Sequence, residues 1–99
     1  MTPKIRPTPI GDFIQEDILV EFGLNQVQLA KALKVSRKTV NDLVHNKRTL
    51  TPEIAIRLGK FTQTSPQLWL NLQQNLDLWD ATHGKHSKEI ESIIAFDVQ

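Results

Sequence analysis

The sequence predicts an all-α protein that consists of one domain and a short C-terminal tail. Hairpin dipeptides are absent, and apolar and polar residues show little alternation before the last ten positions. Apolar residues instead recur at helical spacing, and residues that start and stop helices separate the apolar groups. A chain of 99 residues with 39% hydrophobic and 23% charged residues has the size and composition of a single globular domain.

The first expected helix covers residues 11–22 and follows an N-terminal arm, residues 1–10, that contains three prolines. The early part of this helix is rich in acidic residues, and Gly23 supplies a stop signal. Four apolar residues have helical spacing: Phe13, Ile14, Ile18 and Leu19. These features predict an amphipathic helix, although Ile10 between a proline and a glycine leaves its start open.

The second and third expected helices, residues 26–33 and 37–45, begin at polar caps. Asn25 precedes the second helix, and Gln28 three residues later completes a variant of the capping box. Ser36 precedes the third helix, where a hydroxyl oxygen accepts hydrogen bonds from the free N–H groups of the first turn.

The fourth and fifth expected helices, residues 52–62 and 66–81, share the same start signal. Each follows a hydroxyl residue and opens with a proline, at "TP" and "SP". Proline is favoured at the first helical position because its fixed backbone angle suits the helix and its missing N–H would be unpaired there.

Only three residues, 34–36, connect the second and third helices. Such a short connection holds two helices at a steep angle, so residues from about 26 to 45 form a candidate helix-turn-helix unit. Its apolar residues are expected to face one another: Leu29, Leu33, Val35, Val40, Leu43 and Val44. A helix pair that binds no nucleic acid would show the same apolar pattern.

Charge is unevenly distributed along the chain, although the net charge is only +1. Residues 26–60 carry eight basic against two acidic side chains, a net +6, whereas residues 1–25 carry −2 and residues 61–99 carry −3. A basic segment between two acidic ones indicates a local surface for a polyanion, with acidic flanks available to other partners.

The third helix has one apolar and one polar side. Val40, Leu43 and Val44 share one side at about 100° per residue. The opposite side and its edges carry donors and acceptors that suit phosphate oxygens or base edges: Arg37, Lys38, Thr39, Asn41, Asp42 and His45. Lys47 and Arg48 follow in the next loop, and Gln26 lies at the positive end of the second helix, where it can donate to a phosphate.

Two interpretations of this polar side remain. It is either a solvent-exposed face with an ordinary i,i+4 ion pair between Lys38 and Asp42, or a surface that reads DNA. The basic segment and the short turn favour the second. Asp42 would then either neutralise Lys38 and orient it, or accept a hydrogen bond from cytosine N4. The i,i+4 geometry favours the first role, because it needs no DNA.

The chain resembles the HigA-type antitoxins, a branch of the Xre/phage-repressor helix-turn-helix proteins, from about Pro7 to Thr82. The helix-turn-helix pattern "QVQLAKALKVSRKTVNDLVH" is shared by many repressors, whereas "LTPEIAIRL" and "SPQLWLNLQQNLDLW" are specific to this branch. The resemblance implies an all-α DNA-binding domain over residues 11–82 and a homodimer on palindromic operator DNA. It also implies repression of the protein's own operon and neutralisation of a HigB-type mRNA endonuclease. A solitary repressor without a toxin is the alternative.

By position in the family motif, Gln26 is the expected phosphate contact, the third helix faces the major groove, and Lys47 and Arg48 face the backbone. The candidate DNA-binding residues are Gln26, Ser36, Arg37, Lys38, Thr39, Asn41, Asp42, His45, Lys47 and Arg48.

The sequence departs from the family pattern at Lys34, Asn46 and Gln63, where relatives commonly have glycine after a helix. Such positions often need positive φ, which asparagine tolerates and lysine or glutamine adopts at a cost. We therefore expect local strain or a slightly different turn at these positions, without loss of the fold.

The fifth helix carries an apolar stripe of five residues: Leu68, Trp69, Leu72, Leu76 and Trp79. Core packing explains this stripe. Leu70 and Leu78 are expected to point away from it, which suggests a second buried surface. Leu70, Leu78 and Trp79 are therefore the candidate dimer interface.

The tail, residues 83–99, follows a polar hinge and ends in an acidic, apolar segment that is helix-like at residues 90, 93 and 94 and strand-like at 94, 96 and 98. It would pack back onto its own subunit, dock a basic toxin, or exchange onto a dimer mate. His83 and His86 in the hinge have no matched third ligand, so we expect no metal site.

The composition excludes several functional classes. The chain has no cysteine, its four glycines are isolated, and no Ser-His-Asp arrangement is recognisable, so we expect no enzyme activity, cofactor or small-molecule substrate. The first residues contain no apolar run, which argues against a signal peptide or membrane span and favours a cytoplasmic location.

Overall fold

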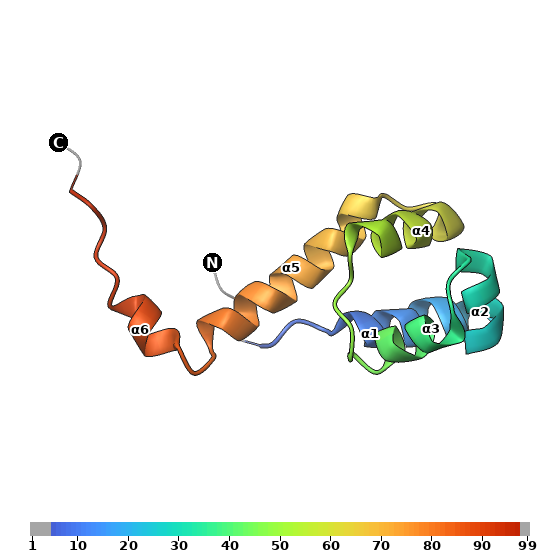
Figure 1. Ribbon diagram of the computed structural model, residues 1–99, viewed down its shortest axis with the longest axis horizontal. Coiled ribbons are helices and arrows are strands. Elements are labelled where there is room, and N and C mark those ends of the chain that lie inside the picture. Colours follow the sequence, from blue (N-terminus) through green and yellow to red (C-terminus); the bar gives the residue numbers. More distant parts are fainter. Residues whose placement is uncertain (1–4, 98–99) are drawn as a thin grey trace.

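The computed structural model describes residues 5–97; residues 1–4 of the expected arm, and Val98 and Gln99 of the tail, lie outside the described residues. Every regular element in the described part of the chain is helical, which confirms the all-α prediction (Figure 1). The elements are α1 (Ile10–Phe13), η1 (Ile14–Val20), α2 (Gln26–Leu33), α3 (Arg37–Val44), α4 (Pro52–Thr62), α5 (Pro66–Thr82) and α6 (Ser87–Glu91).

The four helices α2 to α5 begin at the residues that the sequence predicts. Asn25 Oδ1 accepts from the backbone N of Gln28 at 2.8 Å, and Gln28 Oε1 accepts from the backbone N of Asn25 at 2.9 Å. Ser36 Oγ accepts from the backbone N of Thr39 at 3.1 Å. Two further hydroxyl caps precede the prolines that begin α4 and α5: Thr51 and Ser65. Each cap satisfies an N–H group that the helix itself leaves unpaired.

The first helix differs from the expected one in two respects. It begins at Ile10, and its central part, η1, is a π-helix. Hydrogen bonds in a π-helix join residues five apart, so such residues share a face more closely than in an α-helix. Ile14 and Leu19 are five apart, and both are buried with Ile18. Gly23, at φ +67°, ends the helix as predicted.

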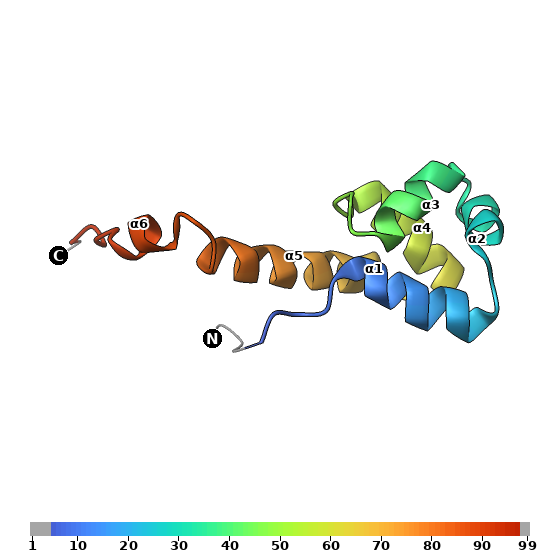
Figure 2. The same cartoon turned by 90° about the horizontal axis from the view of Figure 1, so that it is seen from below.

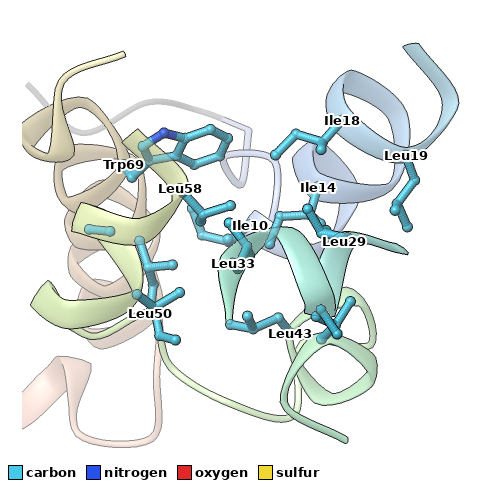
Figure 3. Packing of buried hydrophobic residues seen from close by; sticks show 14 residues of the cluster. Ile10, Ile14, Ile18, Leu19, Leu29, Leu33, Leu43, Leu50, Leu58 and Trp69 are labelled. Atoms are coloured by element: carbon cyan, nitrogen blue, oxygen red, sulfur yellow. The ribbon is translucent and has the colours of Figure 1, made fainter. Parts of the chain in front are cut away.

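One hydrophobic core joins α1, η1 and α2–α5 (Figure 3). Leu58 of α4 and Val40 of α3 are fully buried, and the indole of Trp69 reaches the core from α5. The Trp69 side chain donates from Nε1 to Thr64 Oγ1 at 2.8 Å, which satisfies its polar group. α4 packs along α5, whereas α3 packs against α2 and α1.

The apolar surface of α5 is arranged differently from the prediction at two positions. Leu68, expected in the core stripe, is 47% exposed, and Leu70, expected to point away, is half-buried and packs against the core. At the beginning of α5, α4 packs on the side that carries Leu70, so this side faces the core. Leu78 is 60% exposed, as expected, whereas Trp69 and Leu76 are buried.

The three unusual turn residues adopt the backbone conformation predicted for them. Lys34, Asn46 and Gln63 have φ values of 58°, 57° and 58°. The backbone N of Gly11 donates to Asn46 Oδ1 at 2.8 Å, so the asparagine side chain also joins the end of α3 to α1. For Lys34 and Gln63 the left-handed conformation is a local cost that the surrounding helices impose.

Residues 83–97 of the tail extend away from the rest of the protein (Figures 1 and 2). The α6 helix accounts for part of the helix-like pattern, and residues 93–97 form no strand. Ile94 is 90% and Phe96 86% exposed, so these two residues do not pack back onto their own subunit, which was one of the three alternatives for the tail. The radius of gyration is 16.6 Å, compared with about 13 Å for a compact chain of this length. Within residues 5–97, no helix has the length and apolarity needed to span a bilayer.

Candidate nucleic-acid interface

The α3 helix separates apolar from polar side chains as predicted. Val40 and Leu43 face the core and are at most 2% exposed. Six candidate residues at the two ends of the helix and in the following loop are exposed: Ser36, Arg37, Lys38, His45, Lys47 and Arg48. The others are half-buried: Gln26, Thr39, Asn41 and Asp42. The fold therefore brings all ten candidates onto α3, its flanks and the start of α2.

Side-chain hydrogen bonds hold several of these groups in place. Asn41 Nδ2 donates to Gln26 Oε1 at 3.1 Å, which connects the middle of α3 to the first residue of α2. The hydroxyl groups of Ser36 and Thr39 lie 2.9 Å apart. These contacts restrict rotamers before any ligand arrives, and such restriction lowers the entropic cost of binding.

The expected ion pair is present on this surface. Lys38 Nζ donates to Asp42 Oδ2 at 2.8 Å, with the Lys38 side chain 81% and the Asp42 side chain 18% exposed. The hydrogen bond from Lys38 lowers the pKa of the Asp42 carboxyl from its ordinary value, and the positive charges of Lys38, Arg48 and Lys47 lower it further. Asp42 thus lies within a basic environment, and none of the ion pairs within residues 5–97 involves Arg37, Lys47 or Arg48.

The loop after α3 is held against the N-terminal end of α1. Asn46 receives the Gly11 hydrogen bond, and the backbone N of Lys47 donates to the carbonyl of Asp42 at 2.8 Å. A Cβ on Gly11 would lie 2.3 Å from the carbonyl oxygen of Val44, so only glycine allows this close approach. The position of Lys47 and Arg48 is therefore set by α1 as well as by α3.

A second contact joins the N-terminal segment to α5 beside this loop. Arg6 donates from Nε and Nη2 to the two carboxylate oxygens of Asp80 at 2.8 and 3.0 Å. The hydrogen bond from Arg6 lowers the pKa of Asp80 below its ordinary value. Between this pair and the loop lies a cavity of about 270 Å³ whose walls include Lys47, Arg48 and Asp77.

Comparison with known proteins identifies the family. The helix-turn-helix family model matches residues 16–69, which contain the whole candidate unit. Antitoxin HigA-1 of Vibrio cholerae is 34% identical over 90 residues, which cover 91% of this chain and 84% of that protein. The chain belongs to the helix-turn-helix family that includes the HigA antitoxins.

Two further relatives are one protein of known structure and one transcriptional regulator compared by sequence. A solved structure of the Pseudomonas aeruginosa antitoxin HigA with the higBA promoter is 41% identical, covers 91% of this chain and 97% of that one, and superposes with a TM-score of 0.84. An uncharacterised helix-turn-helix transcriptional regulator of Haemophilus influenzae is 39% identical over 84 residues, covering 85% of this chain and 78% of the regulator.

Sequence reasoning missed two contacts between residues that are distant in the sequence. Arg6 with Asp80, and Gly11 with Asn46, are separated by 74 and 35 positions. No local pattern marks such pairs, although glycine in the first turn of a helix was a signal of close packing for Gly11. Within residues 5–97, no three His, Asp or Glu side chains are grouped so that they could hold a metal ion.

Proposed function

We propose that this protein is a HigA-type antitoxin that binds operator DNA, represses its own operon and neutralises a HigB-type mRNA endonuclease. The observation that carries the proposal is the 41% identity, over nearly the whole chain, to a HigA antitoxin whose structure contains its promoter. The helix-turn-helix family model matches residues 16–69, and relatives of this chain include a transcriptional regulator and an antitoxin.

For DNA binding, α3 would enter the major groove with its polar side toward the base edges. Arg37, Lys38 and Asn41 supply donors for bases, while Lys47 and Arg48 in the following loop suit the phosphate backbone. Gln26 at the N-terminus of α2 would donate to a phosphate, aided by the positive end of that helix. Asp42 neutralises Lys38 and holds it through the 2.8 Å ion pair, and in this proposal it does not itself read a base.

A homodimer would place two α3 helices on the two halves of a palindromic operator. The exposed Leu78 and the half-buried Trp79 on the outer part of α5 support an interface there. Leu78→Glu is the cleaner test, because Leu70 also packs against its own core. Light scattering should report a monomer for Leu78→Glu and a dimer for the control Gln74→Glu; a dimer in both would contradict this interface.

DNA binding is tested by gel shifts on the protein's own promoter and on a scrambled fragment across a salt series. The logarithm of affinity should fall linearly with the logarithm of salt concentration, and Lys47→Gln or Arg48→Gln should each reduce the slope by about 1. Equal binding to promoter and scrambled DNA at every salt concentration would contradict the proposal.

The toxin partner is tested by expressing the neighbouring open reading frame with and without this protein. Arrest of growth that co-expression relieves supports an antitoxin, whereas a neighbour without toxicity supports the second candidate, a solitary repressor. The similarity to the Haemophilus influenzae transcriptional regulator favours that second candidate.

A further inference from the structure

The turn between α2 and α3 is held from outside the helix-turn-helix unit by Arg57 of α4. Arg57 Nη1 donates to the carbonyl of Leu33 at 2.8 Å and to that of Lys34 at 3.2 Å. Its other terminal nitrogen, Nη2, donates to Glu53 Oε1 at 2.8 Å, one turn earlier on α4. A single guanidinium group therefore connects α4 to the residues at which α2 ends.

Within residues 5–97, no backbone N–H donates to either of these two carbonyls in the turn. The backbone N of Lys34 donates to Lys31, and the backbone N of Val35 donates to Ala30, so this reversal satisfies earlier carbonyls of α2. The last carbonyls of a helix carry its negative dipole end, and a cation that hydrogen-bonds to them is favourably placed.

The arginine is fixed in position at some cost. Its side chain is 34% exposed, and its Nε is buried without a hydrogen-bond partner among the described residues. Burying an unpaired donor is unfavourable, so the contacts of the two terminal nitrogens must outweigh it. α4 packs against α2 and makes few contacts with α3, so its influence on α3 passes through the turn.

We propose that Arg57 is a positioning residue for DNA recognition, because it fixes the direction in which α3 leaves the turn at Lys34–Ser36. The inference rests on the proposed DNA-binding function of α3. Arg57 acts through the turn, because it holds the Leu33 and Lys34 carbonyls, and Lys34 adopts φ 58° at this point. Loosening the turn would let α3 tilt. Contacts between its side chains and the base edges would then be weakened more than contacts to the phosphates.

The test measures the ratio of the affinities for the protein's own promoter and for a scrambled fragment. Each variant is measured at a temperature at which circular dichroism reports a folded protein. Arg57→Gln should lower the ratio about tenfold, the value of roughly one specific base contact. Arg57→Lys, which keeps the charge but cannot reach both carbonyls and Glu53, should give an intermediate ratio. Lys60→Gln is the matched control, because it removes one positive charge from the exposed side of α4. It should lower the affinity for the promoter and for the scrambled fragment equally, so that their ratio is unchanged.

An Arg57→Gln protein that keeps the wild-type ratio, even with a lower melting temperature, would overturn the inference and leave Arg57 with a purely structural role. If Arg57→Gln does not fold, Arg57→Lys takes its place: a lowered affinity ratio supports the inference, and the wild-type ratio contradicts it. A wild-type protein that does not prefer its promoter would instead contradict the proposed function itself.

Discussion

Replacing Gly11 with alanine should separate α1 from the end of α3. The added Cβ would lie 2.3 Å from the carbonyl oxygen of Val44, 2.6 Å from that of Leu43 and 2.7 Å from Asn46 Oδ1. Two of these atoms belong to the backbone, so rotation of a side chain cannot relieve the overlap. α1 must move away from α3, and the 2.8 Å hydrogen bond from the Gly11 backbone to Asn46 is then lost.

The magnitude follows from three contributions. Overpacking of this kind costs about 1–3 kcal/mol, and loss of the hydrogen bond adds about 1 kcal/mol. The better helix propensity of alanine offsets up to about 1 kcal/mol. The net loss of unfolding free energy is about 1–4 kcal/mol, which lowers the melting temperature by about 5 °C or more in a domain of this size.

Thermal unfolding followed by circular dichroism measures this loss, with Asp12→Ala as the matched control. Asp12 is the next residue of the same helix, and its side chain is exposed, so the control reports the effect of a new alanine without the overlap. If Gly11→Ala melts within about 2 °C of the control, a difference smaller than about 0.5 kcal/mol, the close approach of α1 to α3 is not as described.

Three further predictions concern single residues. Lys34→Gly should raise the free energy of unfolding by about 1 kcal/mol, because glycine adopts positive φ without strain; a lower melting temperature would contradict this. Asp42→Asn should leave base preference in a binding-site selection unchanged and tighten binding to all DNA; relaxed preference at one operator position would show that Asp42 reads cytosine. Asp80→Asn should lower the melting temperature at about pH 6 and have progressively less effect as the pH falls below 3.8, the ordinary carboxyl value. The sign follows from the lowered pKa of Asp80: its ion pair stabilises the folded state while the carboxyl is charged, and that contribution disappears as the carboxyl is protonated in both states. An undiminished difference at low pH would exclude the ion pair as its cause.

Much of the fold could be predicted because its signals are local. The capping box of Asn25 with Gln28 and the ion pair of Lys38 with Asp42 join residues three and four apart. Helical geometry alone brings such pairs together, so the residue types suffice to predict them. The positive φ values of Lys34, Asn46 and Gln63 were predicted on a different basis, the glycine that relatives commonly have at these positions after a helix.

Predictions about the direction of apolar side chains were less successful. On α5, Leu68 is exposed and Leu70 is half-buried, the reverse of the prediction, because the position of α4 decides which side of α5 meets the core. The π-helical turns of η1 likewise appear where Ile14, Ile18 and Leu19 must all reach one core. Spacing identifies an apolar set, but the neighbouring helix determines which members it covers.

The sequence by itself determined the all-α class, the boundaries of α2 and α4, and the concentration of basic and polar residues on one side of α3. Only the tertiary structure decided how that helix is held: by Gly11 and Asn46, and by Arg57 at a separation of 24 positions from Leu33. The physical reason is the range of the interactions. Caps and i,i+4 pairs form within one helix, whereas contacts between distant residues exist only after the helices have packed, and their partners are chosen by that packing.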